Sequence, residues 1–106
     1  MISERLDKSI RNVPDFPIKG INFKDITTLL LDSKLSSDII DSFINDLKGT
    51  KIDAIVGVES RGFLFGFLLA NKMGIPFVPI RKTGKLPGET LKYKYDLEYG
   101  SAEVEI

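Results

Sequence analysis

The sequence predicts an α/β fold in which two parallel strands are joined by a crossover helix. Residues 52–58 form a nearly unbroken apolar run, typical of a strand buried on both faces. Residues 63–73 are apolar over helical length, stop at Gly74, and are expected to place their stripe from Phe63 to Leu69 in the core. Residues 75–80 form a second strand-like run despite two prolines. Strand, helix and strand in this order predict one βαβ unit.

The segment before this unit contains two expected helices and one short strand. Residues 3–12 place apolar side chains at helical spacing, with Ser3 as the N-cap, before prolines end the helix. Residues 20–24 alternate apolar and polar, which predicts a short strand followed by a loop. An apolar stripe at the helical period predicts a helix over residues 33–48.

The segment after the βαβ unit is expected to hold a basic loop and two strand segments. Residues 81–92 are rich in Lys, Gly and Pro, which is typical of a mobile loop. Alternating patterns then begin at Tyr93 and recur over residues 102–106. Two parallel strands with one crossover helix leave a sheet face to be covered by a partner chain, a mixed sheet or residues beyond Ile106. We favour further residues.

The composition limits the chemistry available to the chain. With 106 residues, 42% hydrophobic and 28% charged, it has the size and balance of one globular domain. Fifteen basic and fifteen acidic residues give no net charge, which disfavours a nucleic-acid partner. The absence of Cys and His removes thiolate nucleophiles and the commonest neutral-pH base. No apolar block approaches the roughly 20 residues of a membrane helix, so we expect a cytoplasmic protein with no membrane partner.

The first candidate site is the segment Glu59–Gly62, between the end of a strand and the start of a helix. Open α/β sheets bind ligands at this edge. The N–H groups of a helix N-terminus and the forked donor of Arg61 both suit phosphate oxygens. The alternative is an ordinary turn with Ser60 as N-cap and Arg61 paired to Glu59. Spacing alone leaves both interpretations open.

A second candidate site is the basic cluster Arg81, Lys82 and Lys85, which follows the next strand at the same edge. Its convergence with Arg61 favours an anion site, and a solvated loop with scattered charge is the alternative. The Gly and Pro content of residues 83–88 fits a lid that closes over a ligand, and fits an ordinary flexible loop as well.

Two further segments carry candidate side chains. Glu98, beside Tyr99, is the best remaining group for proton transfer in a chain without His, although an acidic hairpin edge would have the same composition. Phe23 would stack on a planar ring if a ligand binds there, and otherwise packs in the core.

Five motifs, taken in order along the whole chain, resemble the adenine phosphoribosyltransferases. They are Asp15-Phe16-Pro17, Gly20–Asp25, Glu59–Gly66, Arg81-Lys82 with Gly84–Pro87, and Asp96–Gly100. The resemblance implies a type I phosphoribosyltransferase fold with a parallel sheet core and an N-terminal hood. It also implies one incomplete domain, with the hood and base-binding segment in residues 1–32 and the first part of the α/β core, with its flexible loop, in residues 33–106.

One motif of the family is absent from the chain. The acidic, Thr- and Gly-rich loop that binds the 5-phosphate has no counterpart in residues 1–106. It is expected after Ile106, so that the C-terminal part of the core is missing here. We therefore expect the 106-residue chain to be inactive alone and the activity to belong to a longer protein.

The resemblance implies transfer of a ribose 5-phosphate group from phosphoribosyl pyrophosphate to N9 of adenine, which gives AMP and pyrophosphate in purine salvage. Magnesium is carried with the phosphoribosyl pyrophosphate, and no residue is assigned as its ligand. A homodimer is also implied. A noncatalytic ligand-binding or regulatory module on the same scaffold is the alternative, because fold alone does not determine function.

The same resemblance assigns roles to individual residues. The pyrophosphate group would be held by residues at the edge of the sheet, with a cis peptide bond between the first two: Glu59, Ser60, Arg61, Arg81, Lys82 and Lys85. Asn22 and Lys24 would contact adenine through backbone groups while Phe23 packs on its ring. Glu98 and Tyr99 would handle a proton near the base, and Arg61 would stabilise the charge of the departing pyrophosphate.

Overall fold

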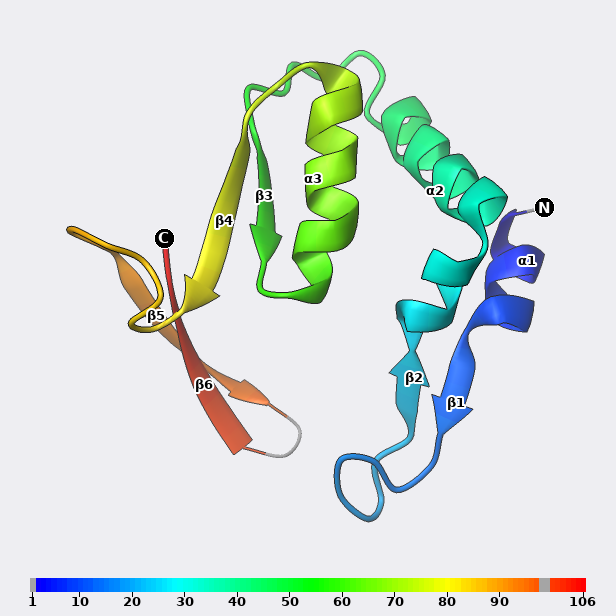
Figure 1. Ribbon diagram of the computed structural model, residues 1–106, viewed down its shortest axis with the longest axis horizontal. Coiled ribbons are helices and arrows are strands. Elements are labelled where there is room, and N and C mark those ends of the chain that lie inside the picture. Colours follow the sequence, from blue (N-terminus) through cyan, green and yellow to red (C-terminus); the bar gives the residue numbers. More distant parts are fainter. Residues whose placement is uncertain (1, 98–99) are drawn as a thin grey trace. The chain divides into compact units, whose positions relative to one another are not determined.

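The computed structural model describes residues 2–97 and 100–106, which fall into two compact units (Figure 1). The first unit is Met1–Asn45 and the second is Asp46–Ile106. No helix within the described ranges is both long and apolar enough to span a membrane.

The first unit begins with a helix and a two-stranded antiparallel hairpin. Helix α1 spans Ile2–Ser9 and is followed by β1 (Arg11–Val13), which pairs with β2 (Phe23–Asp25). The predicted helix over residues 3–12 is therefore too long, because pairing with β2 outweighs the helical spacing after Ser9. Ser3 lies inside α1 and is not its N-cap. The strand predicted over residues 20–24 is shorter, since β2 starts three residues later and ends one residue later.

A 3₁₀ helix, η1 (Ile26–Leu31), and helix α2 (Ser33–Asp46) complete the first unit. The segment of η1 was expected to be a loop, but Asp25 accepts a hydrogen bond from the Thr27 amide and so begins a helical turn. Helix α2 confirms the first part of the predicted apolar stripe, since Leu35, Ile39 and Ile40 are buried, but it ends two residues before the predicted end at residue 48, and Phe43 is 42% exposed. Leu29 of η1 is buried as well.

The second unit contains the predicted βαβ motif. Strand β3 (Ile55–Val58), helix α3 (Arg61–Met73) and strand β4 (Phe77–Lys82) follow in order, and β3 pairs with β4 in parallel. Gly74 ends α3 with a φ of 70°, a left-handed conformation that glycine adopts without steric cost. The prediction of strand, crossover helix and parallel strand is confirmed.

The sheet of the second unit is mixed, with strand order β3-β4-β6-β5. Strands β5 (Lys92–Leu97) and β6 (Gly100–Glu105) form an antiparallel hairpin, and β6 pairs antiparallel with β4. The expected parallel sheet core is therefore parallel only between β3 and β4. Antiparallel pairing prevails afterwards because β5 and β6 are joined by a connection too short for a parallel crossover. The expectation that residues 52–58 form a strand buried on both faces is wrong, since β3 starts only at Ile55, and Val56 and Val58 are 50% and 44% exposed.

Phe77 of β4 anchors helix α3 to both parallel strands. Its ring meets Phe63 and Phe67 edge-on, at centroid distances of 5.8 and 6.1 Å. A Cβ atom at Gly57 in β3 or at Gly66 in α3 would lie 2.7 Å from a carbon of this ring. The two glycines thus make the close approach of helix and strands possible. The expectation that the whole stripe from Phe63 to Leu69 is core is wrong, since Phe67 is 58% exposed and α3 turns only one face to the sheet.

Candidate functional site

The parallel strands β3 and β4 bring two predicted segments to one edge of the sheet. Val58, the last residue of β3, is the partner of Ile80 in the parallel register, and β4 continues for two residues, Arg81 and Lys82, which were expected to lie in the loop. The amide of Glu59 donates a hydrogen bond of 2.8 Å to the carbonyl oxygen of Ile80. The segment that starts α3 and the segment that follows Ile80 therefore share the edge at which α/β sheets bind ligands, as predicted.

Glu59 connects the two segments through its side chain. Its Oε1 atom accepts hydrogen bonds from the Lys82 amide at 3.0 Å and from Nε of Arg81 at 3.1 Å. The hydrogen bond from the Lys82 amide, with a smaller contribution from Arg81, holds the pKa of Glu59 below its ordinary value. Glu59 is thus a carboxylate held by two residues of β4, and it orients Arg81.

Helix α3 begins at this edge. Ser60 occupies the N-cap position but makes no side-chain capping hydrogen bond, contrary to the ordinary-turn interpretation. The peptide bond between Glu59 and Ser60 is cis, as the resemblance implies. Arg61 is the first residue of α3 and its side chain is exposed. The first turn of a helix presents N–H groups to anions, and Arg61 adds a positive charge there.

The basic loop is held at its base by β6. The Lys85 amide donates to the carbonyl oxygen of Lys82 at 3.2 Å, and the Thr83 hydroxyl donates to Glu103 at 2.8 Å. Glu105 accepts three further hydrogen bonds from the loop, from Gly84, Leu86 and Thr90. Sequence analysis placed Glu105 only on the polar side of a strand. Its role depends on the pairing of β6 with β4, which the residue pattern does not indicate.

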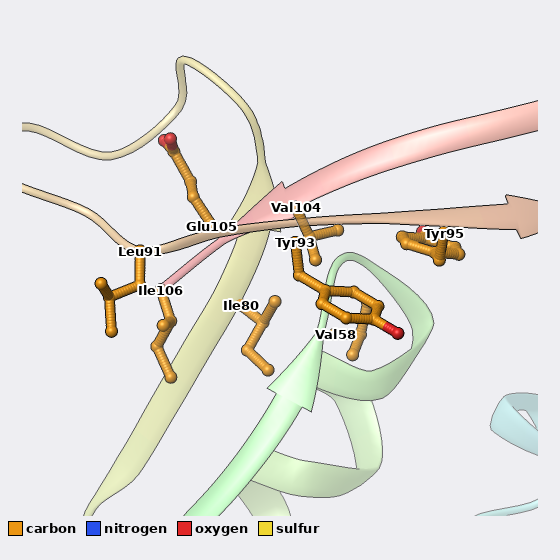
Figure 2. Close-up of a pocket in the computed structure, with 8 residues that line it drawn as sticks. All are labelled: Val58, Ile80, Leu91, Tyr93, Tyr95, Val104, Glu105 and Ile106. Atoms are coloured by element: carbon orange, nitrogen blue, oxygen red, sulfur yellow. The ribbon is translucent and has the colours of Figure 1, made fainter.

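A cavity of about 410 Å³ lies against the sheet of the second unit (Figure 2). It is lined almost entirely by apolar side chains, namely those of Val58, Ile80, Leu91, Tyr93, Tyr95, Val104 and Ile106, together with Glu105. In Figure 2 the Glu105 carboxylate turns away from Tyr93 and Ile80 and toward the loop. The cavity is not lined by Arg61, Arg81 or Lys85. The predicted convergence of these three cations on one ligand therefore remains a prediction.

The hairpin of the first unit holds the predicted base-binding residues. Phe23 packs edge-on against Phe16 with ring centroids 5.2 Å apart, and both rings line a cavity of about 310 Å³. Lys24 lies opposite Asn12 in the hairpin, and its Nζ atom donates to the Asn12 side chain at 3.2 Å. Asn22 is exposed just before β2. Phe23 thus has both expected features, a packing partner and a face on a cavity.

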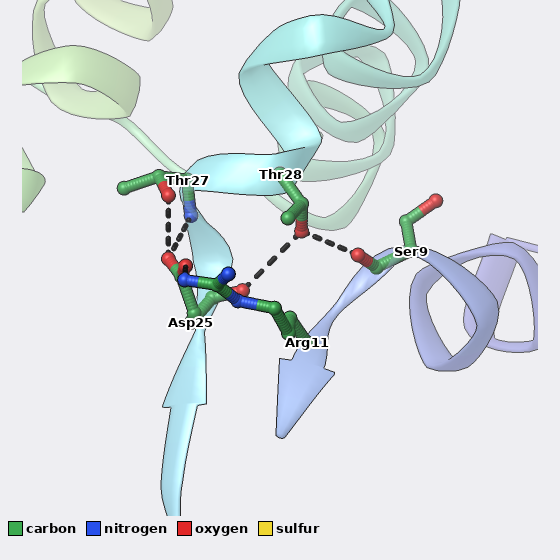
Figure 3. A network of polar contacts seen from close by, with 5 residues as sticks. All are labelled: Ser9, Arg11, Asp25, Thr27 and Thr28. Atoms are coloured by element: carbon green, nitrogen blue, oxygen red, sulfur yellow. Dashed lines mark hydrogen bonds and ion pairs between the residues drawn. The ribbon is translucent and has the colours of Figure 1, made fainter. Parts of the chain in front are cut away.

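Asp25 is a structural carboxylate among the residues that line this cavity, and Figure 3 shows its polar contacts. It is 8% exposed and accepts hydrogen bonds from the Thr27 hydroxyl and amide, at 2.5 and 2.9 Å, and from Arg11 at 2.7 Å. The bonds from Thr27 and, more weakly, from Arg11 lower the pKa of Asp25. The neighbouring Thr28 hydroxyl donates to the Ser9 carbonyl oxygen, which ties η1 to the end of α1. Sequence analysis did not single out Asp25, although a short Asp-x-Thr spacing after a strand is a capping signal.

Two predicted site residues and a possible metal site are still to be described. Glu98 and Tyr99 lie outside the described residues, so their roles remain predictions. Within residues 2–97 and 100–106, no group of three or more acidic or other ligand side chains is arranged to hold a metal ion.

Comparison with known proteins shows which proteins the chain is similar to. No family model matches the chain. Over 101 residues, the chain is 55% identical to an adenine phosphoribosyltransferase of Clostridium botulinum, covering 95% of this chain and 59% of that protein. It is 52% identical over 106 residues to the corresponding enzyme of Thermoanaerobacter pseudethanolicus, covering 100% of this chain and 61% of that one. The chain is a homologue of the adenine phosphoribosyltransferases.

Solved structures agree with this homology. The crystal structure of the adenine phosphoribosyltransferase of T. pseudethanolicus matches with a TM-score of 0.91 at 51% identity, over the whole chain and 61% of the other. The Saccharomyces cerevisiae adenine phosphoribosyltransferase, in complex with an imino-altritol bisphosphate and adenine, matches with a TM-score of 0.91 at 45% identity, over 99% and 62%. The type I phosphoribosyltransferase fold is confirmed, and the chain spans about three fifths of the length of its curated adenine phosphoribosyltransferase relatives.

Proposed function

We propose that the chain acts in the transfer of a phosphoribosyl group from phosphoribosyl pyrophosphate to adenine. In this reaction the bond between the sugar C1′ and the diphosphate oxygen breaks, and a bond between C1′ and N9 of adenine forms. The N9 proton leaves, and the products are AMP and pyrophosphate. The observation that supports the proposal best is the shared edge of β3 and β4 in a homologue of these enzymes, where Arg61 starts the helix after β3, and Arg81 and Lys82 are the last residues of β4.

On the diphosphate side, positive groups would stabilise the leaving pyrophosphate. Negative charge accumulates on the diphosphate as the C1′–O bond breaks, and preorganised cationic donors stabilise that charge. Glu59 accepts a hydrogen bond from Nε of Arg81, which restricts the guanidinium, and the two terminal nitrogens of that group carry further N–H donors suited to phosphate oxygens. Ser60 and Arg61 would contribute from the start of α3, and Lys85 from the basic loop.

On the base side, Phe23 would pack on the adenine ring while Asn22 and Lys24 offer backbone donors and acceptors. The cavity beside Phe23 supports this assignment, because an aromatic side chain on a cavity wall suits a planar heterocycle. Glu98 and Tyr99 are proposed to receive the N9 proton. Magnesium is proposed as part of the substrate, since diphosphate oxygens are the hard ligands that it prefers.

The test is an assay of the longer protein to which the activity is expected to belong, with adenine, phosphoribosyl pyrophosphate and Mg²⁺ as reactants and with AMP and pyrophosphate as the products measured. The 106-residue chain is assayed beside it and is expected to form no AMP alone. Hypoxanthine in place of adenine is the specificity control. Calorimetric titrations with adenine and with pyrophosphate run in parallel. AMP formation supports the proposal, whereas binding of both ligands without turnover identifies the alternative, a noncatalytic ligand-binding module. No binding of either ligand would reject both functions for this chain.

Three further expectations remain proposals. The homodimer is tested by sedimentation equilibrium of the purified chain. The cytoplasmic location is tested by fractionation of the source cells. The division into a hood of residues 1–32 and a core of residues 33–106 is tested by expressing each piece and measuring whether it folds.

A further inference from the structure

Glu105 is a buried carboxylate whose contacts all lie in the basic loop and the strands beside it. The residue is 3% exposed and stands near the end of β6, opposite Arg81 in β4 and Lys92 in β5. Val104 and Ile106, on either side of it in the sequence, line the apolar cavity, whereas the Glu105 carboxylate points the other way (Figure 2). A buried carboxylate costs free energy unless it is well hydrogen-bonded, so its partners indicate its role.

The two oxygens of Glu105 bind both ends of the loop between β4 and β5. Oε1 accepts hydrogen bonds from the amides of Gly84 at 3.1 Å and Leu86 at 3.0 Å. Oε2 accepts a hydrogen bond from the Thr90 hydroxyl at 3.1 Å. One side chain therefore joins the start of the loop to its end.

Lys85 lies between the two amides that share Oε1. Its backbone is bound on both sides to the same carboxylate oxygen, and its own amide donates to the Lys82 carbonyl oxygen. The Lys85 side chain itself is exposed. Fixing the backbone at three consecutive residues restricts where the ammonium group can reach, which reduces the entropy lost when that group binds an anion.

We propose that Glu105 is a positioning residue, which holds the basic loop so that Lys85 faces the diphosphate of the substrate. This inference rests on the proposed function for its ligand, and on the contacts of Glu105 for its geometry. The hydrogen bond from the Leu86 amide, followed by those from Thr90 and Gly84, keeps the pKa of Glu105 below its ordinary value. The carboxylate is thus held in the charged form that accepts these bonds best.

The test compares the variants Glu105→Gln and Glu105→Ala with Glu103→Gln. Glu103 is the matched control, because it lies on the same side of β6 and binds the loop only at Thr83. The first measurement is hydrogen exchange at the Gly84 and Leu86 amides of the whole chain. We expect exchange to rise modestly in Glu105→Gln and by roughly tenfold or more in Glu105→Ala, with no change in Glu103→Gln.

Hydrogen exchange in helix α3 distinguishes a change confined to the basic loop from a loss of the whole fold. Amides of buried Leu69 and Ala70 should exchange as in the wild type. If Glu105→Ala also raises exchange there, the conclusion is drawn from Glu105→Gln, which keeps the size of the side chain and an acceptor oxygen. Unchanged exchange at Gly84 and Leu86 in both variants would overturn the proposal.

The second measurement is the affinity for inorganic pyrophosphate in a double-mutant cycle with Lys85→Ala. We expect Glu105→Gln to weaken binding by roughly fivefold in the wild-type background and to have little effect once Lys85 is absent. Equal effects in both backgrounds, or no effect in either, would show that Glu105 is structural only and would overturn the positioning role. A wild-type chain with the expected exchange pattern but no pyrophosphate binding would reject the proposed function and the assigned role of Lys85, and would still show that Glu105 holds the loop.

Discussion

Glu59 and Arg81 join the ends of two parallel strands through a single carboxylate oxygen, with Oε1 of Glu59 3.1 Å from Nε of Arg81 and 3.0 Å from the next amide. A carboxylate at the mouth of a site for anions is at first unexpected. The Glu59 carboxylate already accepts hydrogen bonds from Arg81 and from the Lys82 amide in β4, however. We therefore expect it to affect a ligand by orienting the Arg81 guanidinium. This relationship makes the edge of the sheet sensitive to acid.

Acid should destabilise the chain, and Glu59→Gln should reduce that effect. Because its hydrogen bonds lower the pKa of Glu59, its stabilising contribution is present above the ordinary pKa near 4.5 and is lost as the pH falls through the lower folded-state value. We expect the midpoint of thermal unfolding of the wild type to fall as the pH decreases below about 4.5, and that of Glu59→Gln to fall less steeply. The exposed Glu89→Gln serves as the control and should follow the wild type. Parallel curves for Glu59→Gln and the wild type would contradict the assignment.

Gly57→Ala should destabilise the fold by about 1–3 kcal/mol, the usual cost of overpacking. The added Cβ would lie 2.7 Å from both the Gly62 carbonyl oxygen and the Phe77 ring, and the backbone oxygen cannot move without separating α3 from β3. Gly62→Ala is the matched control, because its nearest contact would be an ordinary 3.4 Å. Urea denaturation measures both variants. If Gly57→Ala and Gly62→Ala are equally stable, the packing of Gly57 against the Phe77 ring is not as close as described.

Arg61→Ala should weaken pyrophosphate binding by roughly 10- to 100-fold, the range expected for loss of a charged hydrogen-bonding partner. Adenine binding should be unchanged, because Arg61 is assigned to the diphosphate side only. Lys72→Ala, which removes a cation from the last turn of the same helix, should leave both affinities near the wild-type values. Calorimetric titration of each ligand distinguishes these outcomes, and unchanged pyrophosphate affinity in Arg61→Ala would remove that residue from the site.

Asp25→Asn should loosen the start of η1 and lower the midpoint of thermal unfolding. The neutral amide still offers one acceptor, but it loses the ion pair with Arg11 and the strong bonds that a carboxylate accepts from Thr27. Hydrogen exchange at the Thr27 amide should increase more than exchange within α2. Asp7→Asn, on the exposed surface of α1, is the comparison variant and should match the wild type. Unaltered exchange at Thr27 would mean that the cap does not depend on the charge.

The sequence predicts the local elements of this chain better than their assembly. The βαβ unit and the stripe of α2 follow from periodicity alone, because burial of one face imposes that spacing. The end of α1 at Ser9 and the mixed sheet do not, because each depends on pairing with a strand elsewhere in the chain. For the candidate site, the shared edge of Arg61 and Arg81 is predictable from the parallel strands. The partners of Glu59 and Glu105 are not, because a carboxylate's hydrogen bonds depend on distances between strands.

The packing of the Phe77 ring against Gly57 and Gly66 affects the proposed binding of substrate, although Phe77 is assigned no contact with a ligand. The Phe77 ring, which belongs to β4, sets the distance of helix α3 from β3 and β4. Helix α3 begins at Arg61, whose positive charge is assigned to the proposed reaction. A smaller hydrophobic side chain in place of Phe77 would let α3 slide or tilt by a fraction of an ångström. Orientation at a charged site depends steeply on such shifts. The proposed activity is therefore sensitive to mutation of a half-buried packing residue that is assigned no contact with the substrate.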